Sequence, residues 1–217
     1  KNIAIGVSAL GAQNTSSGSD THNVAVGHAS GASLTSGTSN TFVGSLTGFN
    51  MTTASNNTFI GYNSGNDTTT GGDNVAIGSG ALAAQTEGGD NVAIGHLALS
   101  TLTTAGNNTA VGDRAMQAST SGENNVAVGT LALDANTSGS LNTCIGRSAG
   151  SAATTVSDNT FVGAYCGDAA TSGDNTGVGS GALGGSLTGD QNTAVGKNAG
   201  NALTSGVDNV FIGHLAG

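Results

Sequence analysis

The stretch GGDNVAIG occupies residues 71–78 and recurs without a single change at residues 88–95. A spacing of 17 residues is too short for a domain and too long for a coiled-coil heptad. Exact self-similarity at a short fixed period is typical of solenoids and other repeat proteins. The whole chain is therefore best analysed as successive copies of this unit.

The repeating unit reads Asn, then Thr, Val or Ile, then a small or aromatic residue, then Val or Ile, then Gly. Thirteen copies follow one another at spacings of 21, eight times 17, 16, 17 and 17 residues. The copies begin at Asn2, Asn23, Asn40, Asn57, Asn74, Asn91, Asn108, Asn125, Asn142, Asn159, Asn175, Asn192 and Asn209.

Positions in the unit are numbered here from its Asn. Positions 2–4 are apolar or β-branched and predict a short strand. The invariant Gly at position 5 indicates a tight bend or a close backbone approach, and the TSG segment with a following Asp indicates a turn. Positions 8–12 are compatible with either a second strand or one helical turn.

Seventeen residues cannot bury a core alone, whereas stacked units can. The sequence therefore predicts an all-β protein, a parallel β-solenoid or β-roll of about thirteen 17-residue coils, as a single repeat array over residues 1–217. The chain starts at Lys1 and ends within a repeat, so we expect an excerpt of a longer fibre.

The two faces of the strand predict a partner chain. Neighbouring strand residues point to opposite faces, so the β-branched positions 2 and 4 are expected to fill the coil interior. Position 3 then faces outward, yet it is Ala, Phe, Cys or Gly in every unit and needs a cover. Another copy of the chain is the expected cover, with the second arm as the alternative. The inter-chain contact candidates at position 3 are Phe42, Phe59, Phe161 and Phe211.

Composition excludes several classes of partner. The formal net charge is −9, and the four basic residues, Lys1, Arg114, Arg147 and Lys197, are scattered along the chain. Nucleic-acid binding and attachment to anionic membranes both need clustered positive charge, so neither is expected. No apolar run reaches the roughly 18 residues that predict a membrane-spanning helix.

The repeated polar residues are interpreted as structural. The Asn at position 1, from Asn23 to Asn209, predicts a ladder of stacked side-chain amides. The Asp residues before the Asn are expected to cap turns, with weak calcium binding as the alternative. The Thr row at position 13 indicates a turn rather than a flat ice-binding array. These aspartates are Asp73, Asp90, Asp158, Asp174, Asp190 and Asp208.

Candidates for chemistry are few. His28, His96 and His214 share position 6, where a trimer axis could gather copies of one His around a metal, but the residues at this position vary as on an outward face. Cys144 and Cys166 replace small residues and are expected to be buried and free. No nucleophile–base pair or phosphate loop interrupts the repeat. We expect no enzyme activity and no cofactor or metal, and the only irregular segments are residues 14–22 and the deletion before Asn175.

NVAIG, NTAVG and NVAVG, followed by Ala-Leu and TSG, resemble the head repeats of trimeric autotransporter adhesins and, more closely, the repeats of phage tail fibres that end in an intramolecular chaperone. The resemblance covers essentially the whole chain. It implies a left-handed parallel β-roll in a tight homotrimer. The adhesin coil is shorter, so the extra residues here would enlarge a turn or the second arm.

The resemblance and the uncovered face together predict a structural fibre protein. We expect the shaft or head of a homotrimeric surface fibre, extracellular on a virion or a cell, that positions a receptor-binding region. One alternative is an adhesin module that binds a host glycan or matrix protein directly through the rod surface. Another is a filament that stacks end to end, because uncapped solenoid ends offer open strand edges.

Overall fold

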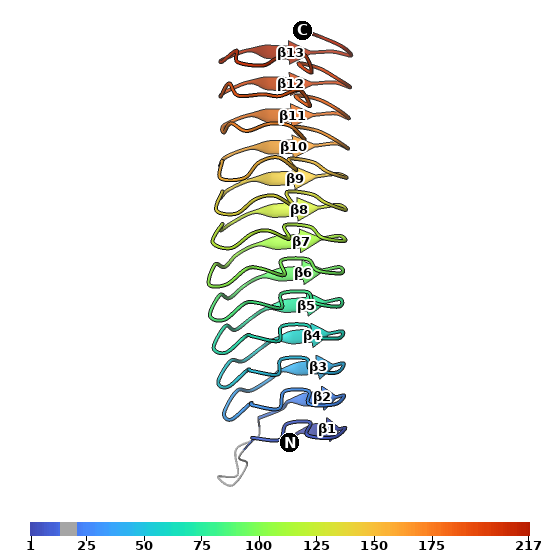
Figure 1. The fold of residues 1–217 in the computed structure, drawn as a ribbon, viewed down its shortest axis with the longest axis vertical. Coiled ribbons are helices and arrows are strands. Elements are labelled where there is room, and N and C mark those ends of the chain that lie inside the picture. The colour runs from blue at the N-terminus through green and yellow to red at the C-terminus, as the bar shows by residue number, and fades with distance from the viewer. Residues whose placement is uncertain (14–20) are drawn as a thin grey trace. The chain divides into compact units, whose positions relative to one another are not determined.

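The computed structural model describes residues 1–13 and 21–217, and every regular element within them is a three-residue β-strand (Figure 1). The described chain divides into two compact units, Lys1–Asn107 and Asn108–Gly217. The first unit holds β1 (Ile3–Ile5), β2 (Val24–Val26), β3 (Thr41–Val43), β4 (Thr58–Ile60), β5 (Val75–Ile77) and β6 (Val92–Ile94). The second unit holds β7 (Thr109–Val111), β8 (Val126–Val128), β9 (Thr143–Ile145), β10 (Thr160–Val162), β11 (Thr176–Val178), β12 (Thr193–Val195) and β13 (Val210–Ile212).

Within each unit the strands pair in parallel with their neighbours in chain order. Equivalent repeat positions lie side by side, as Val75 does with Val92 in the first unit and Thr143 with Thr160 in the second. Each repeat is thus one turn of a parallel β-solenoid, as predicted.

The Gly at position 5 turns the chain out of the strand. Gly78 has a φ of +137°, in a region that only glycine adopts readily. A Cβ placed there would lie 2.4 Å from the carbonyl oxygen of Gly95 in the next coil. Both predicted reasons for glycine, the sharp bend and the close backbone approach, therefore hold at this position.

The second arm is neither of the two structures that its sequence allowed. It is a run of turns in which positions 7 and 9 have positive φ, as in Leu97 at 55° and Leu99 at 50°. Its N–H groups bond to neighbouring coils: Leu97 donates to the Ser79 carbonyl at 3.0 Å, and Leu82 donates to the Ala98 carbonyl at 3.0 Å. The coils are thus joined along the second arm as well as along the strands.

The strand faces the opposite way from the prediction. Position 3 points into the coil and is fully buried, as in Ala76 and Phe59, whereas positions 2 and 4 point outward. The reason is volume: the interior between strand and second arm is narrow and admits Ala, Cys or Gly, or a Phe opposite a Gly. The β-branched side chains at positions 2 and 4, which outnumber those at position 3, therefore point out of the coil.

Three of the four Phe side chains predicted as inter-chain contacts are consequently buried inside the coil. Phe42, Phe59 and Phe161 have no exposed surface within the single chain, and Phe211 in the last coil is partly buried. The rings of Phe42 and Phe59 contact each other in adjacent coils in a tilted arrangement, with centroids 6.0 Å apart and an interplanar angle of 45°. Phe42, Phe59 and Phe161 are core, and the prediction that these three face another chain is wrong; for Phe211 it stays a prediction.

The irregular spacings leave the coil intact where they are described. After the deletion, Ser172 is buried and accepts a hydrogen bond from the Asn175 side chain at 3.0 Å, and β10 still pairs in register with β11. Of the other irregular segment, residues 14–20 lie outside the described residues. Only Thr21 and His22 of that segment are described.

Candidate interaction surfaces

The predicted Asn ladder is present inside the coils. Asn40 Oδ1 accepts from the backbone N–H of Asn57 at 3.0 Å and from its side-chain amide at 3.2 Å. Asn40 Nδ2 in turn donates to the Ala54 carbonyl of its own coil at 2.9 Å. Asn125 and Asn142 repeat the pattern in the second unit. Because these amides are fully buried and bonded, they close and stack the coils and offer nothing to a ligand.

The outward rows at positions 2 and 4 form what we name the strand face of each unit. Every side chain on it is Thr, Val or Ile, and none is charged. In the first unit it consists of Ile3, Val24, Thr41, Thr58, Val75, Val92, Ile5, Val26, Val43, Ile60, Ile77 and Ile94. In the second it consists of Thr109, Val126, Thr143, Thr160, Thr176, Thr193, Val210, Val111, Val128, Ile145, Val162, Val178, Val195 and Ile212.

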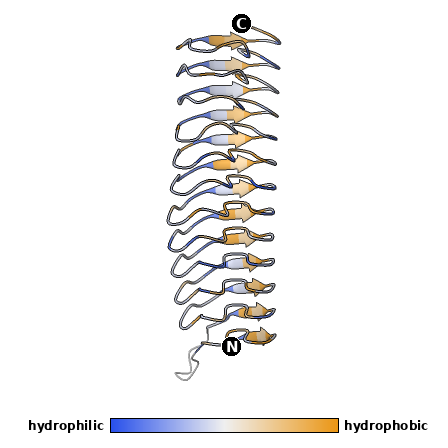
Figure 2. Cartoon of the chain, in the orientation of Figure 1, coloured by the Kyte–Doolittle hydropathy of each residue, from blue (hydrophilic) through white to orange (hydrophobic). Residues whose placement is uncertain are grey.

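The strand face is apolar and open to solvent. Val43, Ile60 and Ile94 are 36–38% exposed, although each has a paired strand beside it. Figure 2 shows the hydrophobic colour concentrated along the strands and the hydrophilic colour in the turns that lead into them. Sequence reasoning missed this surface because it placed the β-branched residues inside the coil.

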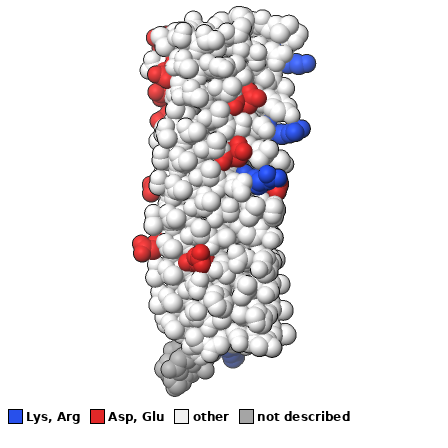
Figure 3. All heavy atoms as spheres, in the orientation of Figure 1, with Lys and Arg blue, Asp and Glu red and all other residues white. Residues whose placement is uncertain are grey.

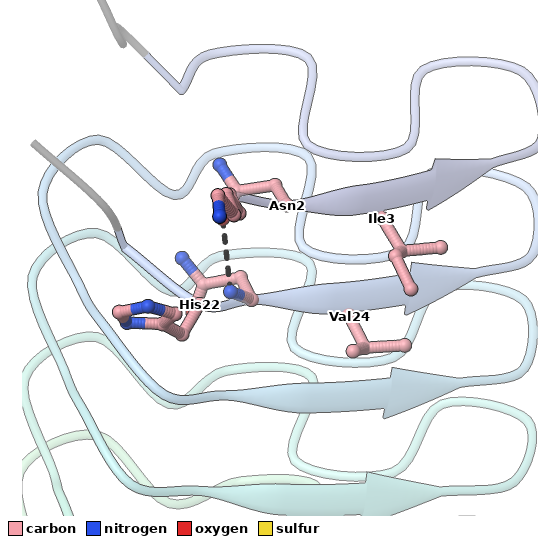
Figure 4. Close-up of a pocket in the computed structure, with 6 residues that line it drawn as sticks. Asn2, Ile3, His22 and Val24 are labelled. Carbon is pink, nitrogen blue, oxygen red and sulfur yellow. Dashed lines mark hydrogen bonds between the residues drawn. The ribbon is translucent and has the colours of Figure 1, made fainter. Parts of the chain in front are cut away.

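A shallow hollow lies at the first two coils of the strand face. Lys1, Asn2, Ile3, His22, Asn23 and Val24 line it. Ile3 and Val24 lie one after the other on β1 and β2, and the Asn23 N–H donates to Asn2 Oδ1 at 2.9 Å (Figure 4). The Oδ1 of Asn2 is thereby used within the ladder, and Ile3 and Val24 of the strand face form the apolar part of the wall, with Lys1 and His22 beside them.

Positions 6 and 7 follow the invariant Gly and form what we name the corner edge. It carries the three candidate His residues, but His28 and His96 are four coils apart in the first unit, and His214 is in the last coil of the second. Across residues 1–13 and 21–217, no group of three or more His, Cys, Asp or Glu side chains could hold a metal. The structure therefore does not bring the His candidates together.

The corner edge of the second unit also carries Arg114, Arg147 and Lys197, together with Tyr165. The guanidinium carbon of Arg147 lies 5.4 Å from the centre of the Tyr165 ring, within cation–π distance. Figure 3 shows most of the Lys and Arg side chains along one edge, with some Asp and Glu side chains beside them and the other Asp and Glu side chains elsewhere. From the sequence alone, these basic residues had been interpreted as scattered.

The repeated aspartates lie in exposed turns. Asp73 and Asp90 have φ of 59°, so the left-handed residue of the turn is position 17 rather than the preceding Gly. Asp73 accepts from the Asn56 side chain at 3.0 Å, and Asp190 accepts from the Gly173 N–H at 3.2 Å. These bonds support the turn-capping interpretation.

The Thr row at position 13 uses its hydroxyls between coils. Thr35 donates to the Thr52 carbonyl at 2.9 Å, and Thr69 donates to the Thr86 carbonyl at 2.9 Å. Thr137 does the same to Thr154 in the second unit at 3.0 Å. This row ties neighbouring turns together, in agreement with its interpretation as part of a turn.

Cys144 and Cys166 are free and fully buried, as predicted. Burial raises the pKa of each thiol to about 12, because the thiolate cannot be solvated inside the coil. A nucleophilic role for either side chain is therefore disfavoured at neutral pH.

Comparisons of the chain with family models, curated proteins and solved structures found no match. The resemblance to adhesin and tail-fibre repeats thus rests on the quoted motifs alone. Outside residues 14–20, the chain has no helix long and apolar enough to cross a membrane.

Proposed function

We propose that this chain is the shaft or head of a homotrimeric extracellular fibre, of the kind that phages and bacteria use to position a receptor-binding region. The observation that carries the proposal is the strand face: two rows of uncharged Thr, Val and Ile that no part of the described chain covers.

A parallel sheet is normally covered on both faces. Here the second arm covers the position-3 face, and positions 2 and 4 are left in water. A continuous apolar strip on a soluble protein typically marks an interaction surface. The sequence predicts that position 3 needs a covering partner. Because position 3 is buried in the coil, positions 2 and 4 are the ones that need it.

A second and third copy of the chain are the occupants that fit this surface best. Each copy presents an identical strip with a repeat of about 4.8 Å per coil, so identical copies match coil for coil. The strip carries no charge, and burying it in a closed cyclic oligomer leaves no unpaired ion inside. The number three comes from the resemblance to trimeric adhesin and tail-fibre repeats.

The first test is the solution mass, measured by light scattering on a gel-filtered sample. A mass near three times 20.6 kDa is the expected result. A monomer at micromolar concentration would overturn the proposal.

Two variants then locate the interface. Ile60→Asp with Ile94→Asp places two charges on the strand face without entering the coil, so the expected product is a folded monomer with an unchanged β-type circular dichroism spectrum. Ser79→Asp with Thr130→Asp adds the same charge at the exposed position 6, where Asp113 occurs naturally, and should stay trimeric. A trimer in both variants would place the interface elsewhere.

The two alternatives stay predictions with separate tests. An end-to-end filament would give a broad length distribution by electron microscopy, whereas a discrete fibre gives one length. Direct binding of a glycan or matrix protein would need a surface that is polar and exposed, and the corner edge is the one developed below.

A further inference from the structure

The corner edge of the second unit combines an aromatic ring with positive charge on a chain that is otherwise strongly acidic. Arg147 follows β9 and Lys197 follows β12, each directly after its coil's Gly bend, and Tyr165 follows β10 one residue further on, after Ala164. Because the bend is the same in every coil, Arg147 and Lys197 leave the solenoid from equivalent points at position 6, and Tyr165 leaves it from the adjacent position 7. The coil between Tyr165 and Lys197 contributes only Ser180 and Gly181 there.

Acidic side chains are largely kept away from this edge. Glu123, Asp158, Asp174, Asp190 and Asp208 of the second unit lie in the turns that lead into the strands, at the other end of each strand. Asp113 lies on the edge and pairs with Arg114 at 3.4 Å, and Asp134 also interacts with Arg114. Arg114 is therefore compensated. Asp168 lies on the second arm three residues after Tyr165 and is partly buried, so Arg147 and Lys197 are the exposed cations nearest to Tyr165 along this edge.

The spacing suits an extended ligand. Arg147 and Lys197 are three coils apart, which is about 14 Å at the usual rise between strands. The Tyr165 ring is 41% exposed and lies between them, with Arg147 near it. Exposed aromatic rings offer a flat apolar surface with a polar tip, and Arg recognises carboxylates through paired hydrogen bonds.

We propose that Arg147, Tyr165 and Lys197 form a binding site for a carboxylate-bearing polysaccharide. The two cations pair with carboxylates of sugars that are not adjacent in the polysaccharide, and Tyr165 packs against a sugar ring between them. The neighbouring Ser180 and Gly181 leave room for the chain of sugars to pass along the edge. The inference is independent of the number of chains in the assembly.

The test measures binding of the full chain to polygalacturonate, with neutral dextran as the comparison polymer, by isothermal titration calorimetry at low and physiological salt. We expect binding to polygalacturonate only, weakened by salt. Arg147→Ala with Lys197→Ala should weaken it at least tenfold, and Tyr165→Ala should weaken it severalfold. Ala164 shows that Ala is accommodated at position 6.

The matched control is Asn107→Asp with Asn124→Asp. It changes the net charge from −9 to −11, as the double Ala variant does, but in exposed turns where Asp158 occurs naturally. The control should bind like the unmodified chain. Absence of polygalacturonate binding, equal binding to dextran, or equal loss in both double variants would overturn the site. Light scattering on the same samples reports separately on the trimer.

Discussion

The ring of Phe59 occupies the space that a side chain at Gly65 would need: a Cβ on Gly65 would lie 2.3 Å from the ring. Phe42 with Gly48, Phe161 with Gly167 and Phe211 with Gly217 repeat the relationship six residues apart. Coils with Ala at position 3 carry Leu or Met at position 9 unless the next coil brings a Phe. The interior of each coil is therefore filled either by a Phe from a strand or by a Leu or Met from the second arm.

The combined change of Phe59→Ala and Gly65→Leu should destabilise the protein less than either change alone. Phe59→Ala leaves a cavity and should cost about 3–5 kcal/mol. Gly65→Leu in the presence of Phe59 should also destabilise, by overpacking. The double variant recreates the pair Ala76 and Leu82, so most of the lost stability should return. A double-mutant cycle by urea unfolding measures the coupling, and additive losses would contradict the volume argument.

Removal of one side-chain amide from the Asn ladder should lower the stability of the protein strongly. Asn40→Ala removes the acceptor of the Asn57 N–H and the donor to the Ala54 carbonyl, and both groups are inside the coil. Each buried group left unpaired costs about 1–3 kcal/mol. Asn63→Ala is the control, because Ala29 occupies the equivalent position at the corner edge. Equal midpoints of urea unfolding for the two variants would show that the ladder contributes little.

The thiols of Cys144 and Cys166 should not react with a disulfide reagent in the folded protein. With a pKa of about 12, each Cys is thiolate in only about one molecule in 10⁴ at pH 8, and both are inaccessible. A disulfide reagent such as Ellman's reagent should detect no thiol under native conditions and two in guanidinium chloride. Cys144→Ala should lower the second number to one. Rapid native labelling would mean that the coil opens at β9 or β10.

Asp134 predicts a pH dependence of stability. Burial raises the pKa of its carboxyl, partly offset by backbone hydrogen bonds and by Arg114, and its Oδ1 has no hydrogen-bond partner. A raised pKa in the folded state favours the protonated form. Its contribution is therefore fully present below the unfolded pKa near 3.8 and is lost as pH rises through the folded value.

Asp134→Asn should accordingly raise the melting temperature at pH 7 and leave it unchanged near pH 3. The gain should be a few tenths of a kcal/mol, since the group is partly exposed and screened by solvent. Asp158→Asn, which removes one carboxylate from an exposed turn, is the control for the change in net charge. A gain at pH 3 equal to that at pH 7 would exclude the ionisation as its cause.

Much of the coil follows from the sequence because its period is strict. The spacing of the Asn residues places all thirteen strands, and the Gly after each strand marks the bend. The direction of the strand does not follow from hydrophobicity alone, because both of its faces are apolar. The pairing of Phe59 with Gly65 does contain that information, since a Phe matched to a Gly within one coil shares an interior with it.

The backbone conformation of the second arm could not be predicted from residue preferences. Leu82 and Leu97 adopt positive φ, which Leu seldom does, because the hydrogen bonds to neighbouring coils fix the backbone there. The corner edge was missed for a different reason. Arg147 and Tyr165 are 18 residues apart in sequence, and only the stacking of coils brings them together.

The Asn ladder keeps its bonds although the chain between successive Asn residues varies in length: Asn23 bonds to Asn2 across 21 residues, and Asn175 bonds to Asn159 across 16. The turn before each Asn is thus a place where the gene can gain or lose codons without disturbing the stack. Copies as alike as residues 71–78 and 88–95 invite unequal recombination, which would lengthen or shorten the protein by whole coils. The same turn is also a natural point at which to graft a peptide tag or a foreign epitope, to be displayed at a spacing chosen by counting coils.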